Sequence, residues 1–180
     1  MGKTFTSITD EMRAFVDQQH LFFVGTAPRE GGHVNLSPKG LDSLIILSST
    51  QVAYLDLTGS GAETIAHVRE NGRLTMMFCA FEGLPNIVRF YGQARVVLPS
   101  DPDFAELQTN FPQHGAVRSI IVLDVDRTST SCGYGVPMMN YVKDRPTLDQ
   151  WAAARSSDEV RAYWEEKNAV SIDGLPAVDP

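Results

Sequence analysis

Cysteine is scarce in this sequence, and its scarcity excludes two kinds of architecture. The two cysteines, Cys79 and Cys132, lie far apart in the chain and form no CxxC pair. Disulfide-stapled small domains and zinc ribbons need more cysteines at closer spacing. The four histidines also lack the spacing of metal ligands: His20, His33, His67 and His114. We therefore expect a protein without a metal site.

Positive charge and long apolar runs are missing too. Acidic residues outnumber basic ones by 22 to 15, for a formal net charge of −7. This balance argues against a general nucleic-acid binder, because such a protein needs a basic surface. The first residues, MGKTFTSITDEM, lack the apolar stretch of a signal peptide, and no apolar run has membrane-spanning length. We expect a cytoplasmic protein that binds neither nucleic acid nor membranes.

Recognisable catalytic signatures are absent as well. The chain has no GxSxG, no HExxH and no signature pair of carboxylates. It also does not alternate strands with helices over long stretches, as a doubly wound parallel sheet would. If the protein is an enzyme, its chemistry is therefore expected to come from a cofactor.

What the sequence does contain is a series of short strand-like segments joined by turns. Apolar or alternating runs occur at residues 21–26, 33–37, 44–48, 51–57, 74–81, 87–97 and 119–125. Their connections are mostly short, which favours antiparallel pairing and a small barrel. The length suits one domain. We predict a mainly β (α+β) domain over residues 1–180, an antiparallel barrel of about six strands with a helical extension at about 147–180.

A glycine-rich turn, TGSG at residues 58–61, runs directly into a predicted helix at 62–70. Free N–H groups and the positive end of the helix dipole make such a junction an anion site. Glu63 opposes an anion unless it points away, and a plain capped turn would use the same residues. The candidate ligands of a phosphate are Thr58, Gly59, Ser60, Gly61 and Thr64.

Two strands carry polar side chains on one face. VNLSPKG, residues 34–40, places Ser37 and Lys39 on the same side, and Pro38, which lacks an N–H, is expected to end that strand. A later strand places Arg89 opposite a face of apolar residues. The planar fork of an arginine suits a phosphate. These faces either line a polar pocket or form the solvated exterior of the barrel.

The loop SCGYGVPMMNY, residues 131–141, is a further candidate. Gly133 lies between Cys132 and Tyr134, so the loop could rest against a flat ring through backbone contacts. The same composition would suit an ordered loop that packs on a neighbour. Cys132 has no base beside it in the sequence, which favours a structural thiol over a nucleophile.

Four blocks together resemble a known family. They are SPKG (37–40), DLTGSGAETIAHVRENGRLTMMF (56–78), VRFYGQARV (88–96) and the tail SCGYGVP with SIDGLP (131–137 and 171–176). They are similar to the FMN-binding split-barrel proteins related to pyridoxamine 5′-phosphate oxidase, and most similar to a branch with the SCGYGVP and SIDGLP signatures. The resemblance covers most of the chain.

The resemblance implies a six-stranded split barrel that forms a homodimer with FMN at the interface. It implies that the loop from Cys132 through Gly133 to Tyr134 approaches the isoalloxazine ring, from the partner subunit. It places the FMN phosphate and the neighbouring part of the flavin beside residues already singled out: Ser37, Lys39, Thr58–Gly61, Thr64 and Arg89.

The resemblance further implies an FMN-dependent oxidoreductase, a reductase or an oxidase, that transfers hydride between a small organic substrate and flavin N5. Two alternatives stay open: a deazaflavin-dependent reductase on the same barrel, and a non-catalytic protein that binds or stores flavin or haem. The family's true oxidases carry an Arg–Lys pair where this chain has Glu63 and Thr64. They also end in a tryptophan and an Arg-Leu motif that are missing here. Pyridoxamine-phosphate oxidase activity itself is therefore not expected.

Overall fold

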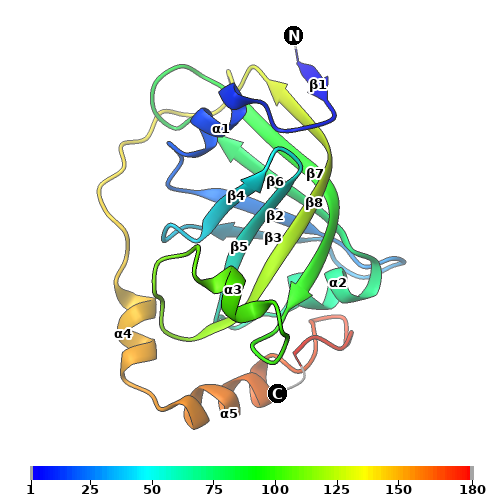
Figure 1. The fold of residues 1–180 in the computed structure, drawn as a ribbon, viewed down its shortest axis with the longest axis vertical. Helices are drawn as coiled ribbons and strands as arrows, with labels where there is room; N and C mark the ends of the chain where they lie inside the picture. The colour runs from blue at the N-terminus through cyan, green and yellow to red at the C-terminus, as the bar shows by residue number, and fades with distance from the viewer. Residues whose placement is uncertain (1, 179–180) are drawn as a thin grey trace.

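One antiparallel sheet, curled into a split barrel, forms the centre of the molecule (Figure 1). The structure is a computed structural model and describes residues 2–178. The strand order is β3-β2-β6-β7-β8-β5-β4, with β1 paired to β8. The strands are β1 (Lys3–Phe5), β2 (Phe22–Thr26), β3 (Asn35–Lys39), β4 (Leu44–Ser48), β5 (Gln51–Leu57), β6 (Arg73–Cys79), β7 (Ile87–Val97) and β8 (Val117–Ser131).

The mainly β split barrel expected from the sequence is confirmed, but the strand count of six is wrong. Within residues 2–178 the sheet has eight strands, of which β2 to β8 coincide with the seven strand-like segments of the sequence. One of them, β1, is three residues long and pairs with the end of β8, where Lys3 lies opposite Thr130. A strand this short carries no alternation that a sequence pattern can register.

In the described part of the chain, five helices accompany the sheet: α1 (Asp10–Val16), α2 (Glu63–Asn71), α3 (Phe104–Gln108), α4 (Thr147–Ala153) and α5 (Ser157–Lys167). Their ends follow ordinary capping chemistry. Gly72 adopts the left-handed conformation, with φ of 73°, and its N–H bonds to the carbonyl of Val68, which ends α2 where the sequence predicts. Ser156 and Glu159 form a capping box at the start of α5.

The main hydrophobic core fills the barrel. Inward residues of neighbouring strands lie in register, so that Phe22 pairs with Phe78 and Phe78 with Val88. These three side chains are at most 4% exposed. A second, smaller cluster lies on the opposite face of β5 and β8, where Phe104 of α3 covers it. Two packed layers of this kind are the usual way to bury both faces of part of a sheet.

The split in the barrel falls between the two edges of the sheet. In the described chain β3 pairs on one side only, with β2, so it is an edge strand. The prediction that Pro38 ends this strand is wrong, since β3 runs through Pro38 to Lys39. An edge strand tolerates proline because one side of its backbone needs no ladder hydrogen bond. The split is where polar residues of β3 face polar residues of β5.

A bulge in β7 occurs where the sequence places a glycine in a long strand. The register with β8 shifts between Tyr91 and Gly92. A side chain at Gly92 would collide with the backbone carbonyl of Asp124. The glycine is therefore required by a close approach of two backbones.

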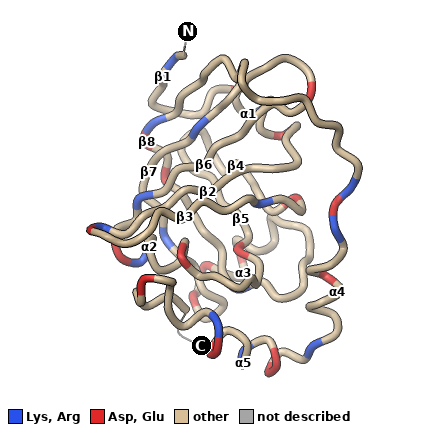
Figure 2. The backbone as a smooth tube through the Cα atoms, turned by 180° about the vertical axis from the view of Figure 1, so that it is seen from behind, with Lys and Arg blue, Asp and Glu red and all other residues tan. Residues whose placement is uncertain are grey.

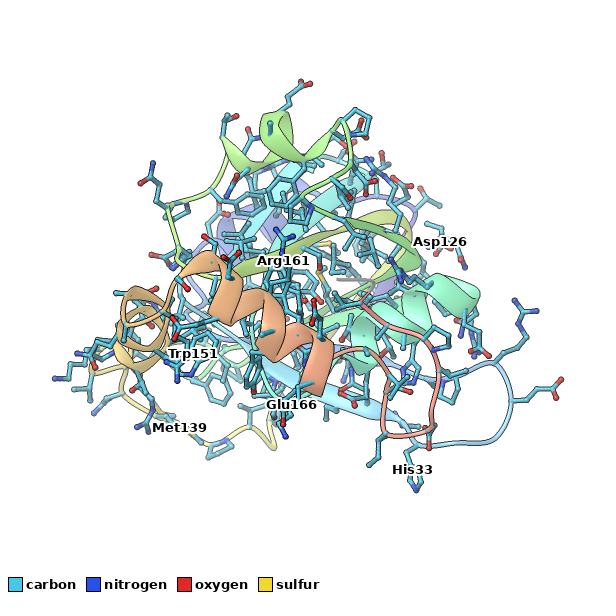
Figure 3. All side chains as sticks on the ribbon, turned by 90° about the horizontal axis from the view of Figure 1, so that it is seen from below. His33, Asp126, Met139, Trp151, Arg161 and Glu166 are labelled. Atoms are coloured by element: carbon cyan, nitrogen blue, oxygen red, sulfur yellow. The ribbon has the colours of Figure 1, made fainter. Side chains whose placement is uncertain are left out.

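The C-terminal quarter of the chain, after β8, wraps around the outside of the barrel. Residues 132–146, called the strap from here on, run down one side to α4, and α5 and the tail cross the lower end (Figures 1 and 3). Basic and acidic positions are interspersed along the backbone (Figure 2). None of the helices between residues 2 and 178 has the length and apolar character of a membrane-spanning helix.

Candidate functional site

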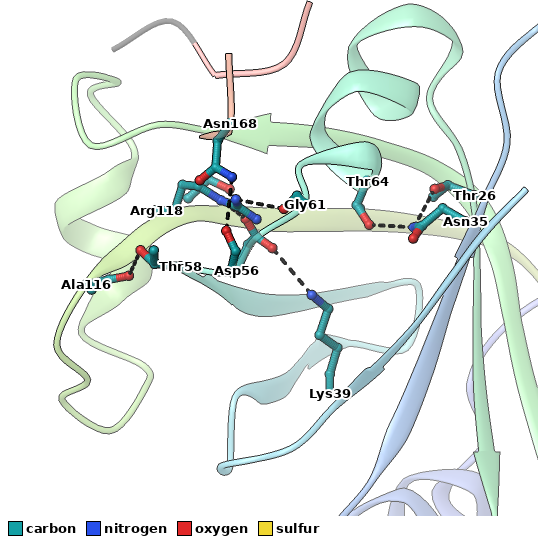
Figure 4. Close-up of polar contacts among 12 residues, drawn as sticks. Thr26, Asn35, Lys39, Asp56, Thr58, Gly61, Thr64, Ala116, Arg118 and Asn168 are labelled. Atoms are coloured by element: carbon teal, nitrogen blue, oxygen red, sulfur yellow. Dashed lines mark hydrogen bonds and ion pairs between the residues drawn. The ribbon is translucent and has the colours of Figure 1, made fainter. Parts of the chain in front are cut away.

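A buried ionic cluster lies at the split of the barrel, between β3, β5 and β8 (Figure 4). Its centre is Asp56, which is 1% exposed and accepts bonds from Arg118 Nε at 2.8 Å and Ser119 Oγ at 3.3 Å. Lys39 Nζ lies 3.5 Å from the other carboxylate oxygen. Burial alone would raise the pKa of Asp56, but the charges of Arg118 and Lys39 and these hydrogen bonds outweigh it and lower the pKa. Lys39 and Arg118 are therefore both already paired with a carboxylate of the protein.

A chain of neutral polar groups continues from this cluster along the inner face of the barrel. Asn35 of β3 donates through Nδ2 to the hydroxyls of Thr26 and Thr64, both at 3.0 Å. Thr26 also bonds to Nδ1 of His67 at 3.0 Å. His67 is fully buried, and burial lowers its pKa. Thr64, a predicted phosphate ligand, therefore already accepts a hydrogen bond within the protein (Figure 4).

Two further groups of this inner face stand out by their environment. Tyr54 is fully buried, and burial raises its pKa well above the ordinary value, with the Asp56 carboxylate adding to the rise. The hydroxyl oxygen of Ser37 is shielded from solvent and has no hydrogen-bond partner within residues 2–178. A buried hydroxyl without a partner is costly, so it marks a place where a ligand or water atom would be stabilised.

The glycine-rich turn is held from below by α5 and from inside by β8. The Thr58 hydroxyl donates to the carbonyl of Ala116 at 2.7 Å and accepts from Trp164 Nε1 at 2.9 Å. Asn168 Nδ2 donates to the carbonyl of Gly59 at 3.0 Å, and Arg118 donates to that of Gly61 at 2.9 Å. The sequence suggests none of these contacts, because they join residues more than 50 positions apart.

A cavity of about 730 Å³ opens beside the turn, between the barrel and the strap. Its walls include Gly40 and Thr58 of the barrel and four rings: His20, Tyr141, Trp151 and Tyr163. His20 stacks on Tyr141 with centroids 3.7 Å apart and planes 13° apart. Trp151 meets Tyr163 edge to face at 5.2 Å. The volume and the aromatic walls are those of a site for a flat organic molecule.

The structure brings most of the candidate residues together but separates four of them. Ser37, Lys39, Thr64 and the turn 58–61 all adjoin the split. Arg89 lies on the outer face of the sheet, because it follows the wholly buried Val88 and pairs with Met77 and Ser129. Its guanidinium donates to Ser131 Oγ at 3.1 Å.

The loop Cys132–Tyr134 is also remote from the split within one chain. It follows the end of β8 at Ser131, whereas the turn 58–61 adjoins the beginning of that strand, where Leu57 pairs with Val117. Cys132 is exposed and Tyr134 is 83% exposed, while Gly133, with φ of 67°, packs against the backbone of Asn86. The length of β8 thus separates this loop from Lys39.

Sequence patterns miss the residue at the centre of the cluster, although a signal is present. Asp56 interrupts the apolar run QVAYLDL, and a charged residue in a buried strand needs a partner. Its partner Arg118 stands directly before another strand-like run, SIIVLDV. The rings of the cavity carry no such signal, because they come from four separate segments: the chain before β2, the strap, α4 and α5. Within residues 2–178, no three His, Cys, Asp or Glu side chains gather in a way that could hold a metal ion.

The chain is similar to several known proteins. Residues 8–132 match the model of the family described as pyridoxamine 5′-phosphate oxidase. The pyridoxamine 5′-phosphate oxidase family protein ustO of Aspergillus flavus is 39% identical over 191 residues, which span 97% of this chain and 77% of the relative.

Solved structures support the fold. HupZ of Group A Streptococcus superposes with a TM-score of 0.54 at 24% identity, over 67% of this chain and 91% of HupZ. The FAD binding protein from Mycobacterium smegmatis superposes with a TM-score of 0.52 at 12% identity, over 72% of this chain and 98% of that protein.

Proposed function

The chain belongs to the pyridoxamine 5′-phosphate oxidase family, and from this membership we propose that it binds a flavin, FMN, and acts as an oxidoreductase on a small organic molecule. A protein of the same fold, from Mycobacterium smegmatis, is an FAD binding protein. The observation that carries the proposal is the cavity between the barrel and the strap. Its volume of about 730 Å³ lies within the range of cofactor and ligand sites, roughly 300–1,000 Å³.

The cavity suits the flat, apolar ring system of a flavin. Tyr141 and Trp151 offer aromatic surface on the strap side, and Leu21 and Leu41 add apolar surface beside Gly40 on the barrel side. Aromatic side chains bind flat rings through stacking and edge-to-face contacts. We therefore assign the isoalloxazine ring to this cavity.

The polar end of the same site lies at the split of the barrel. Ser37 contributes a buried hydroxyl without a partner, and Thr58 lies on the cavity wall. Lys39, with its side chain 20% exposed, borders the split beside Asp56. We assign Ser37, Lys39, the turn 58–61 and Thr64 to the wall that faces the ribityl chain.

When bound, the flavin would supply the hydride acceptor or donor, at N5. The contribution of the protein is to position the ring. The His20–Tyr141 stack lines one side of the cavity, and the Trp151–Tyr163 pair lines another.

The proposal includes a homodimer, and the outer face of the sheet supports it. Pro38, Phe23, Met77 and Arg89 lie in register across four strands on that face, and Leu36 beside them is 65% exposed. Exposed apolar residues such as Leu36, grouped on one face of a sheet, commonly mark a protein interface. In such a dimer, Arg89 and the loop Cys132–Tyr134 of one copy would reach the flavin held by the other.

A titration of the purified protein with FMN tests the proposal. We expect quenching of flavin fluorescence that saturates at one FMN per chain. Anaerobic addition of a reduced nicotinamide, followed by a panel of small oxidants, then tests turnover. Absence of FMN binding would refute the proposed function. If FMN binds but no electron donor reduces it, the protein is a flavin-binding protein and the oxidoreductase part of the proposal is refuted.

A further inference from the structure

The N-terminus of α2 already holds a negative charge of the protein itself. Glu63 is the first residue of the helix, and Ala62 before it offers no side-chain cap. The Glu63 carboxylate folds back over the turn, so that a Cβ added to Gly61 would collide with it. It also accepts a bond from the backbone N–H of Ile172 at 3.3 Å, which ties it to the C-terminal tail. An acidic side chain in this place takes the favourable interaction with the helix dipole that a phosphate would otherwise have.

The other groups that would attract a phosphate to the turn are also engaged. Thr58 uses its hydroxyl hydrogen on the carbonyl of Ala116. The charges of Lys39 and Arg118 are both directed at the buried carboxylate of Asp56. The carboxylate of Glu63 is thus the acidic group that lies against the turn, beside Gly61. A dianionic phosphate placed there would meet this carboxylate.

From this arrangement we infer that the proposed flavin site does not bind the phosphate of FMN at the turn, and that Glu63 is the residue that prevents it. The inference rests on the proposed function and deepens it. The protein recognises the ring and the ribityl chain, which riboflavin and FMN share. The turn then contributes no affinity for the flavin's phosphate, contrary to what its glycine-rich sequence suggests.

Riboflavin and FMN differ only by the phosphate, so their dissociation constants test the inference directly. We expect fluorescence titrations of the wild-type protein to give values within about threefold of each other, because a phosphate that gains no partner contributes little. The substitution Glu63→Gln keeps an acceptor for Ile172 N–H and removes the charge. It should tighten FMN by about tenfold and leave riboflavin unchanged, since one charge removed near a dianion has an effect of this order.

Glu70→Gln is the matched control, because Glu70 lies on the same helix and its carboxylate instead accepts the backbone N–H of Arg29. It should change neither dissociation constant. Wild-type FMN binding more than tenfold tighter than riboflavin binding would overturn the inference, and this comparison needs no variant. Equal responses of Glu63→Gln and Glu70→Gln would overturn it as well. Failure of both flavins to bind would instead refute the proposed function, and the inference with it.

Discussion

Replacement of Asp56 by asparagine should cost a large part of the folding free energy. The substitution keeps the shape of the side chain but leaves Arg118, 4% exposed, and Lys39 without their shared counter-ion. Removing one partner of a buried ion pair typically costs about 3–5 kcal/mol, because the remaining charge stays buried and unpaired. A small domain has only about 5–15 kcal/mol of stability in total. Asp56→Asn should therefore lower the unfolding midpoint in urea steeply.

An exposed ion pair of the same fold supplies the control. Arg95 and Asp103 approach to 3.3 Å, with side chains 48% and 58% exposed. Asp103→Asn should cost less than about 1 kcal/mol, the usual range for surface pairs. Urea unfolding at neutral pH, monitored by circular dichroism, gives the comparison. The slope of the unfolding free energy against urea concentration should be the same for both variants. A cost for Asp56→Asn no greater than that for Asp103→Asn would refute the assignment of a buried, coupled cluster.

The pH dependence provides a second check on the same cluster. The folded state lowers the pKa of Asp56 below its ordinary value of 3.8. Its stabilising contribution is therefore complete above that value and is lost as the pH falls toward the lower folded pKa. Wild-type protein should lose stability in acid below about pH 4 through this group, while Asp56→Asn should lack that component.

Three further predictions follow from the described contacts. If the flavin lies at a dimer interface, Arg89→Ala should weaken FMN binding by about 1.5–3 kcal/mol, and Arg95→Ala by under about 1 kcal/mol. Equal affinities of the two variants would remove Arg89 from the site. Trp151→Ala should weaken FMN binding by about tenfold or more through lost aromatic contact, whereas Leu84→Ala, at an 88% exposed position, should not change the titration. Burial lowers the His67 pKa below 6.5, so the free energy of unfolding should fall as the pH drops through 6.5, by at most about 1.4 kcal/mol per pH unit. Denaturant titrations at several pH values should show that His67→Asn flattens this dependence.

Local chemistry made much of the fold predictable. Thr9 caps α1 by accepting a bond from Met12 N, and Gly72 ends α2, as their residue types indicate. The glycine in β7 marks a bulge for the same kind of local reason. Where the patterns failed, the missing information was non-local. β1 exists only because the end of β8 gives it a partner, and Pro38 stays in a strand only because that strand is at the edge.

The candidate site shows the same division. Sequence alternation placed Ser37 and Lys39 on one face, and the structure has both on the inner side at the split. Alternation within one strand does not indicate which face of a curled sheet is the inner one. The sequence therefore predicts Arg89 beside Ser37 and Lys39, although Arg89 lies on the outer face. The cavity rings of Tyr141 and Trp151 come together only through the path of the strap, which no local pattern specifies.

The most direct test of the account is a crystal structure of the protein with FMN. We expect the isoalloxazine ring in the cavity between the barrel and the strap, in contact with Tyr141 and Trp151, in a homodimer whose second copy brings Arg89 to the flavin. The phosphate should lie away from Glu63 and the turn 58–61. A flavin bound elsewhere, with this cavity empty, would contradict the central claim.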